Sequence, residues 1–545
     1  MSAATKLCNS LDQYHHICTT VLLGKLLKFK MQSRDLSVNQ SALAVQPDSP
    51  LNLDVLRTVM AFASVADLKE LAVVSLPLRE EALREILTRG VHLRRGTARL
   101  QSFCHFMLKR DPPLYPFLHT LILEHIPGRA SDEFDPNDLL QVLSRATYLR
   151  DLRIRWCDHL FTANSALGLP VTLPQLQDLH RLEIWTRQNT TDPLVAKTVL
   201  RLRTQLHNLQ FSSDADNQLP HDFPNLLAVR QQSIHRLRIC YPDLTSIPWA
   251  PFTSVRVLFL TIGNKLPSLP HLAQIFPNLR ELAVVAVGFE VDFGHPAPEH
   301  VKARQDATAF QNSGGGWKSL DVLTTTTIGD PWVLCLACHV RSVRLGNYDV
   351  GSHAAFVDVV SRTRPKKVTL HLACAQYCAK PESEPSIFLF PADPSNKAVA
   401  SLQRVTHAML PFTISSFWQD QTTSAIVDVI VSHISDSRLE YLHLAFAEFF
   451  MASSELDERV LTPRDIHPHS VKVIEDINVD LLVLEVAVAG PHLRVLVLTL
   501  ATRDQSVWMI GNLSEGVGKR ISRVQDPHSA REIIEREERA HLYPN

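Results

Sequence analysis

The chain has 545 residues, of which 45% are hydrophobic and 20% charged, as in an ordinary soluble globular protein. Its 55 basic and 56 acidic residues almost cancel, so neither nucleic acid nor an anionic membrane is expected as the general partner. The nine cysteines are too unevenly scattered to form a disulfide framework. We therefore expect reduced thiols and a location in the cytoplasm, the nucleus or both.

Residues 1–47 are expected to form a disordered leader. An apolar run from Ile17 to Leu27 precedes, instead of following, the basic residues Lys28 and Lys30. That order is wrong for a secretory signal, and the run is too short to cross a bilayer. A true start at Met31 and an amphipathic mitochondrial presequence are the alternatives.

Residues 48–93 carry the pattern of three short helices. Asn52 can cap the first helix, Ser64 with Asp67 forms a capping box for the second, and Pro77 begins the third. Apolar residues at helical spacing give each helix one inward side: Leu53, Leu56, Val59 and Met60; Leu68, Leu71 and Ala72; Leu78, Ala82 and Ile86. So small a unit would leave apolar surface that needs a partner.

This helical segment resembles an F-box. The matching residues are Leu51, Leu53-Asp54-Val55-Leu56, Asp67-Leu68, Leu71, Val73-Val74-Ser75 and Leu78-Arg79. Asn52, Ser75 and Leu78 depart from the family's usual residues. The resemblance implies docking to a Skp-type adaptor, and through it to a cullin. The implied adaptor-binding residues, divided between the module's own core and the adaptor's groove, are Leu51, Leu53, Asp54, Val55, Leu56, Leu68, Leu71 and Val74. The alternative is a helical cap that only seals the first unit of a downstream repeat domain.

Residues 100–510 repeat the template apolar-x-x-apolar-x-apolar. Good copies are Leu118/Leu121/Leu123, Leu149/Leu152/Ile154, Leu179/Leu182/Ile184, Leu206/Leu209/Phe211, Ile234/Leu237/Ile239, Val255/Leu258/Leu260, Leu279/Leu282/Val284, Val340/Val343/Leu345, Leu439/Leu442/Leu444 and Leu493/Leu496/Leu498. Degenerate copies are Leu320/Leu323, Val368/Leu370/Leu372 and Leu402/Val405. The last two apolar residues of a copy are two apart, as in a strand, and stretches between copies have helical spacing. A strand–helix unit of about 20 to 40 residues predicts an α/β leucine-rich-repeat solenoid, an irregular horseshoe of about 12 or 13 repeats.

Three further segments complete the predicted organisation. Residues 288–318 and 379–399 are rich in proline, glycine and serine and are predicted to be loop insertions. Residues 511–545 are predicted to be a charged tail, with a helical pattern after about residue 524.

The strand residues that flank the inward leucines should face the concave side of the solenoid. In several repeats these residues are basic or aromatic: Arg153, Arg155, Arg181, Trp185, Arg236 and Arg238. Arginine and tryptophan often dominate binding energy at interfaces. We hypothesise that this stripe holds an acidic segment of a substrate protein, the alternative being an ordinary solvated face.

Catalytic and metal-binding motifs are weak in this sequence. Cys335, Cys338 and His339 spell the C-x-x-C-H haem pattern, and Cys374 with Cys378 would complete a four-thiolate zinc set. Buried apolar cysteines are the favoured interpretation, so no metal and no cofactor is expected. There is no G-x-S-x-G elbow, kinase signature or dinucleotide fingerprint. We therefore do not expect an enzyme.

An F-box joined to irregular leucine-rich repeats resembles a large group of fungal F-box proteins. That resemblance implies the substrate-recognition subunit of an SCF-type cullin–RING ubiquitin ligase. The competing interpretation is a leucine-rich-repeat scaffold without ligase function, and a third is a metal or haem protein. The sequence does not identify the substrate.

Overall fold

The computed structural model describes residues 53–94, 97–124, 136–155, 168–186, 198–199, 201–202, 204–213, 232–240, 244, 249–263, 267–286, 291–348, 351–373, 402, 404–413, 427–428, 430–431, 434–435, 437–447, 474–500, 505–512 and 518–539. The expected leader, the 379–399 insertion, Leu51, Cys374 and Cys378 lie outside these residues. The chain divides into two compact units, Met1–Leu206 and His207–Asn545. No described helix has the length and apolar character that a membrane crossing requires.

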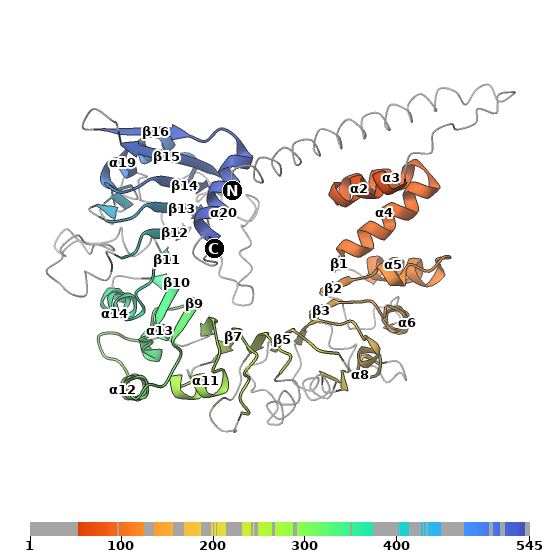
Figure 1. The fold of residues 1–545 in the computed structure, drawn as a ribbon, viewed down its shortest axis with the longest axis horizontal. Coiled ribbons are helices and arrows are strands. Elements are labelled where there is room, and N and C mark those ends of the chain that lie inside the picture. The colour runs from red at the N-terminus through yellow and green to blue at the C-terminus, as the bar shows by residue number, and fades with distance from the viewer. Residues whose placement is uncertain are drawn as a thin grey trace. The chain divides into compact units, whose positions relative to one another are not determined.

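The first unit holds the three predicted helices and the first parallel strands (Figure 1). Its elements are α2 (Leu53–Phe62), α3 (Val65–Val74), α4 (Leu76–Arg89), β1 (Val91–Arg94), α5 (Thr97–Lys109), η1 (Tyr115–Phe117), β2 (Thr120–Glu124), α6 (Pro136–Arg145), β3 (Asp151–Arg155), α8 (Leu169–Thr172), η2 (Leu173–Gln175) and β4 (Arg181–Thr186). Strands β1 to β4 pair in chain order and in parallel.

Local capping explains where α3 and α4 begin, whereas Asn52, the predicted cap of α2, lies outside the described residues. The Ser64 hydroxyl accepts from the Asp67 N–H, and the Asp67 carboxylate accepts from the Ser64 N–H, so the predicted capping box of α3 is confirmed. Ser75 caps α4, with Pro77 in its first turn, where a missing N–H costs nothing. The Arg89 guanidinium donates to the carbonyls of Met60 and Ala63 at the end of α2, and so ties α4 to α2.

The repeat template fixes the register of the strands. Leu121 pairs with Leu152, and Leu152 with Leu182. All three side chains are fully buried. Because side chains alternate along a strand, this register places the predicted leucines on the core side in each turn of the solenoid.

The second unit continues the strand–helix alternation. Its elements are β5 (Asn208–Ser213), β6 (Arg236–Cys240), β7 (Val257–Ile262), α11 (Leu269–Ile275), β8 (Glu281–Ala286), α12 (Pro298–Asn312), β9 (Ser319–Thr325), α13 (Gly329–Leu334), β10 (His339–Tyr348), α14 (His353–Thr363), β11 (Lys367–Ala373), β12 (His407–Thr413), β13 (Tyr441–Ala447), α19 (Val479–Ala489), β14 (Val495–Leu500), β15 (Ser506–Asn512), β16 (Lys519–Arg523) and α20 (Pro527–Arg539). Pairing is parallel from β5 to β14 and antiparallel for β15 and β16. The predicted α/β solenoid class is confirmed.

Within the predicted 288–318 insertion, the described residues 291–318 include a long helix. Fifteen of them form α12, which polar contacts join to α13 and the turn after it. Arg304 donates to the Trp332 carbonyl, and Gln311 bonds to the Cys335 carbonyl and the Ala337 N–H. The prediction of a loop was wrong because α12 buries so little: among its described side chains only Ala307 is fully buried. It therefore lacks the apolar stripe that identifies a helix in a sequence.

The predicted charged tail also contributes to the folded unit. The helical pattern after residue 524 is confirmed as α20, and β16 precedes it. Ile533 and Ile534 of α20 pack against a cluster that includes Tyr441 and Val495. Figure 1 shows α20 on one side of β12 to β14 and α19 on the other. Helix α20 therefore covers apolar strand residues at the end of the solenoid, as a terminal cap does.

Candidate functional site

The helical module α2–α4 presents an apolar surface to solvent. Its exposed members are Phe62 (60% exposed), Val65 (44%), Val73 (60%) and Leu76 (69%), which we call the apolar face. They lie at the end of α2, along α3 and at the start of α4. Exposed large apolar side chains on so small a module are candidate contacts for another protein.

The predicted adaptor-binding residues are mostly elsewhere in the module. Leu56, Leu68 and Leu71 are buried in its own core with Met60 and Leu78. Val74 is half-buried, and Asp54 is exposed beside Arg57. Leu51 and the side chains of Leu53 and Val55 lie outside the described residues. Helical spacing identified the core correctly, but it passed over the apolar face, whose residues lie off the inward stripe or at helix ends.

The predicted basic stripe is an ion-pair ladder in the first unit. Arg155 binds Glu183 at 2.7 Å (Nε to Oε1) and lies 3.7 Å from Glu124. Arg153 binds Asp151 at 2.9 Å, and Arg181 lies 3.4 Å from Glu183. Arg155 is buried, whereas Arg153 and Arg181 are half-buried. Trp185 is fully buried, with the Arg155 guanidinium 4.8 Å from its ring centroid. Because these arginines are paired with carboxylates, this part of the stripe has little uncompensated positive charge with which to bind an acidic ligand.

Arg236 and Arg238, the remaining members of the predicted stripe, belong to β6 in the second unit. Both are half-buried. The Arg236 guanidinium lies over the Phe259 ring, 5.6 Å from its centroid. The structure therefore assigns the six predicted residues to two units, and their role in binding a substrate stays a prediction.

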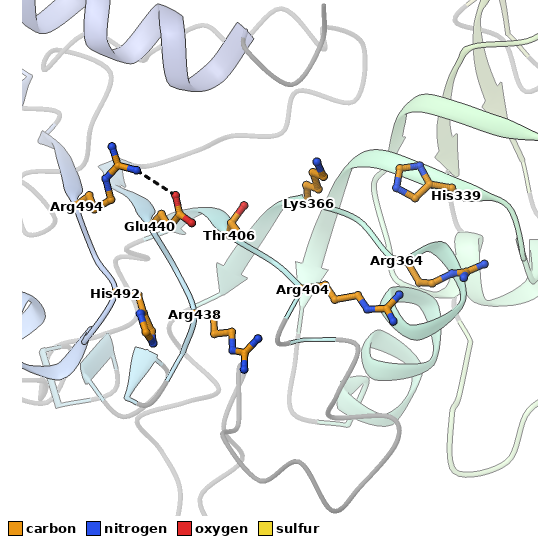
Figure 2. A pocket seen from close by; sticks show the side chains of 9 residues that line it. All are labelled: His339, Arg364, Lys366, Arg404, Thr406, Arg438, Glu440, His492 and Arg494. Atoms are coloured by element: carbon orange, nitrogen blue, oxygen red, sulfur yellow. Dashed lines mark ion pairs between the residues drawn. The ribbon is translucent and has the colours of Figure 1, made fainter. Parts of the chain in front are cut away.

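A second charged surface lies in the later repeats, where the sequence analysis had placed no site. It is a cleft of about 830 Å³, which we call the basic cleft (Figure 2). Nine residues line it: His339, Arg364, Lys366, Arg404, Thr406, Arg438, Glu440, His492 and Arg494. Five of the nine are arginine or lysine and one is an acid. All of them lie at or just before the first residue of strands β10 to β14.

Strand register sets the basic cleft's geometry. Ser342, Lys367, His407, Tyr441 and Val495 are partners on neighbouring strands. The residues three positions earlier form one row, called the outer row: His339, Arg364, Arg404, Arg438 and His492. The residues one position earlier form the inner row, of which Lys366, Thr406, Glu440 and Arg494 line the cleft. Figure 2 shows the last four members of the outer row beside the inner row.

Backbone hydrogen bonds hold the inner row in place. The Thr406 N–H donates to the Lys366 carbonyl at 3.0 Å, Glu440 to Thr406 at 2.8 Å, and Arg494 to Glu440 at 2.9 Å. Adjacent members are therefore separated by the strand spacing of about 4.8 Å. The cleft's charges stand on a continuous ladder, so their order and spacing follow from the sheet.

Positive charge in the basic cleft is only slightly compensated. Glu440, its one acid among the described lining residues, lies 3.5 Å from Arg494. The outer-row residues and Lys366 are exposed to solvent. The pKa of His339 is lowered, first by burial and then by the charges of Arg364, Arg341 and Lys366. An electropositive cleft of exposed guanidinium groups is suited to binding several anionic groups at once.

A sequence signal for the outer row does exist. Each member stands directly before the first position of the repeat: His339-Val340, Arg364-Pro365, Arg404-Val405, Arg438-Leu439 and His492-Leu493. At the same position in the preceding repeats no residue is basic: Phe117, Tyr148, Asp178, Gln205, Ser233, Ser254, Asn278 and Ser319 stand there. Aligning the repeats by this position, and not only by their leucines, would have found the basic cleft.

The cysteine cluster has the character of buried thiols. The Cys335 sulfur lies 3.3 Å from the Thr308 hydroxyl in the interior. Burial raises the pKa of Cys338 to about 11, so this thiol is protonated at neutral pH. Among the residues that the structure describes, no group of three or more His, Cys, Asp or Glu side chains is placed to hold a metal ion.

No protein-family model matches the chain, and no curated protein matches it. The apolar face and the basic cleft are therefore described from the residues and geometry of this chain, and not from a relative.

Proposed function

We propose that the chain is a non-catalytic receptor of the F-box type with leucine-rich repeats. Helices α2–α4 would dock a Skp-type adaptor, and through it a cullin, while the solenoid holds a substrate protein for ubiquitylation. The observation that carries the proposal is the apolar face of a capped three-helix module placed directly before a parallel solenoid. The F-box-like residue order of this module supports it.

The energetics favour a partner for the apolar face. Burying one large aliphatic or aromatic side chain is worth roughly 1.5–3 kcal/mol. Val73 and Leu76 are at least 60% exposed, so a partner that covers them can gain most of this free energy. The capping box and the buried core fix the backbone beneath these residues, and a preorganised surface binds with a smaller entropy cost.

Ubiquitin transfer in such an assembly depends on proximity. A receptor of this kind raises the effective concentration of a substrate lysine near the charged conjugating enzyme. It supplies no acid, base or nucleophile of its own.

One set of contacts favours the competing function, a scaffold in which α2–α4 only cap the solenoid. Arg84 of α4 lies 5.1 Å from the centroid of the Phe117 ring in η1, and Arg110 pairs with Glu80. These contacts attach α4 to the first turn of the solenoid, as a cap requires. They leave the apolar face on α3 uncovered, so the two functions differ in whether that face binds an adaptor.

The test is co-purification of the full chain with a Skp-type adaptor. The double substitution Val73→Glu/Leu76→Glu places two charges on exposed positions of the apolar face and should weaken capture at least about tenfold. The matched control is Val171→Glu, which places the same charge on a residue of α8 that is 45% exposed. Equal capture by the double variant and the wild type, or no capture by the wild type, would leave the cap as the better account.

A further inference from the structure

We propose that the basic cleft binds an acidic segment of a partner protein in an extended conformation, laid across the N-terminal ends of strands β10 to β14. The inference goes beyond adaptor docking and does not depend on it. Every residue of the basic cleft lies between His339 and Arg494, whereas the apolar face lies between Phe62 and Leu76.

The spacing of the outer row favours an extended chain over a single compact anion. Its five members occupy five successive strands, so they span about 19 Å at about 4.8 Å per strand. An extended peptide rises about 3.3 Å per residue, so about six residues would cross the whole row. Because the row's three arginines are exposed and precede three successive strands, a segment with several carboxylates can bind them one after another.

The backbone at Arg364 fixes where this member of the outer row stands. It follows α14 with φ 48°, in the left-handed region that glycine adopts more readily than any residue with a Cβ. Its N–H bonds to the Val360 carbonyl and ends the helix, a task that glycine would perform with less strain. Cys335 ends α13 in the same conformation with φ 49°, so this backbone geometry serves as a helix C-cap, and at Arg364 it leaves the guanidinium lining the cleft.

Nucleic acid fits the basic cleft less well than an acidic peptide does. No Phe, Tyr or Trp side chain is among its described lining residues, so it lacks the stacking platform on which single-stranded bases are usually held. The inner row also contains Glu440, which would repel a continuous phosphate backbone. A protein segment can place an uncharged residue opposite that carboxylate.

The experiment measures binding of a fluorescent oligo-glutamate peptide of about six residues to the full chain, with an oligo-glutamine peptide of the same length as the uncharged comparison. The triple variant Arg364→Gly/Arg404→Ala/Arg438→Ala removes the three arginines of the outer row. Glycine is chosen at position 364 because it suits the left-handed backbone there. The control is Arg280→Ala, an exposed arginine that stands directly before β8 and outside the basic cleft.

The proposal predicts that the wild type and the Arg280→Ala variant bind oligo-glutamate alike. The triple variant should bind at least about tenfold more weakly, since three charge-assisted contacts are lost, while its melting temperature stays close to that of the wild type. Added salt should weaken binding by the wild type.

Three results would overturn the proposal. One is failure of the wild type to bind oligo-glutamate more tightly than oligo-glutamine. Another is unchanged binding by the triple variant. The last is tighter binding of a thymidine oligonucleotide or of inorganic tripolyphosphate through the same arginines, which would assign the cleft to nucleic acid or to a small polyanion. Loss of adaptor capture alone would leave the proposal intact.

Discussion

One mostly buried histidine contributes to the response of the second unit to acid. His371 in β11 is mostly buried, and this burial, followed by the charge of Arg344, lowers its pKa from 6.5 to about 4. As the pH falls below 6.5 the unfolded chain takes up a proton that the folded chain does not accept until about pH 4. His371 by itself therefore costs the folded state up to roughly 3 kcal/mol of stability across that window, whereas Asp330, whose pKa burial raises to about 7, acts in the opposite direction.

Replacing His371 by leucine should remove this contribution to the pH dependence of stability. The variant is expected to lose less stability than the wild type between pH 7 and pH 5, because leucine binds no proton in either state. Urea unfolding at the two pH values measures the difference. The same loss of stability in both proteins would show that His371 does not control the acid response.

The outer row also illustrates what a residue-by-residue analysis of the sequence misses. His339 and Arg364 are far from Arg438 and His492 in the chain, and none belongs to a known motif. Only the strand register brings them into one row. For Arg155 the sequence suggested an open binding position that the structure does not show. Its acidic partners Glu124 and Glu183 come from two other strands, so the pairing could not be seen in the local sequence.

At the scale of elements, the helices and strands that could be predicted were those with a local sequence signal. The cap at Ser64, the buried leucines of β2 and β3, and helix α20 follow from short-range patterns, and all are present. Helix α12 could not be predicted in this way, because polar contacts to α13 and the following turn hold it in place. The glycines that follow α12 are needed for two reasons. Gly314 and Gly316 have positive φ, and at Gly315 a Cβ would lie 2.5 Å from the Phe310 ring.

The capping box of α3 gives a prediction for the helical module. Ser64→Ala removes the acceptor for the Asp67 N–H, and loss of such a cap typically costs about 1 kcal/mol. Ser64→Thr keeps a hydroxyl and should cost much less. Thermal unfolding of the two variants measures the difference. Equal stabilities would mean that packing, and not the cap, positions the start of α3 beneath the apolar face.

At the scale of the whole molecule, the proposed receptor keeps two binding functions in separate parts of one chain. The apolar face belongs to the first unit and the basic cleft to the second. Carrying both in one polypeptide makes the encounter of adaptor and substrate intramolecular, which raises their effective concentration without new contacts. Substitutions in the apolar face should therefore leave peptide binding unchanged, and those in the basic cleft should leave adaptor binding unchanged.

Hydrogen exchange of the full chain, with and without a Skp-type adaptor, tests the central claim most directly. Docking on the apolar face predicts slower amide exchange between Phe62 and Leu76, where contact with the adaptor opposes opening of α3. Exchange in strands β10 to β14 should stay unchanged. Formation of no complex, or of a complex that slows exchange elsewhere but not between Phe62 and Leu76, would contradict the account.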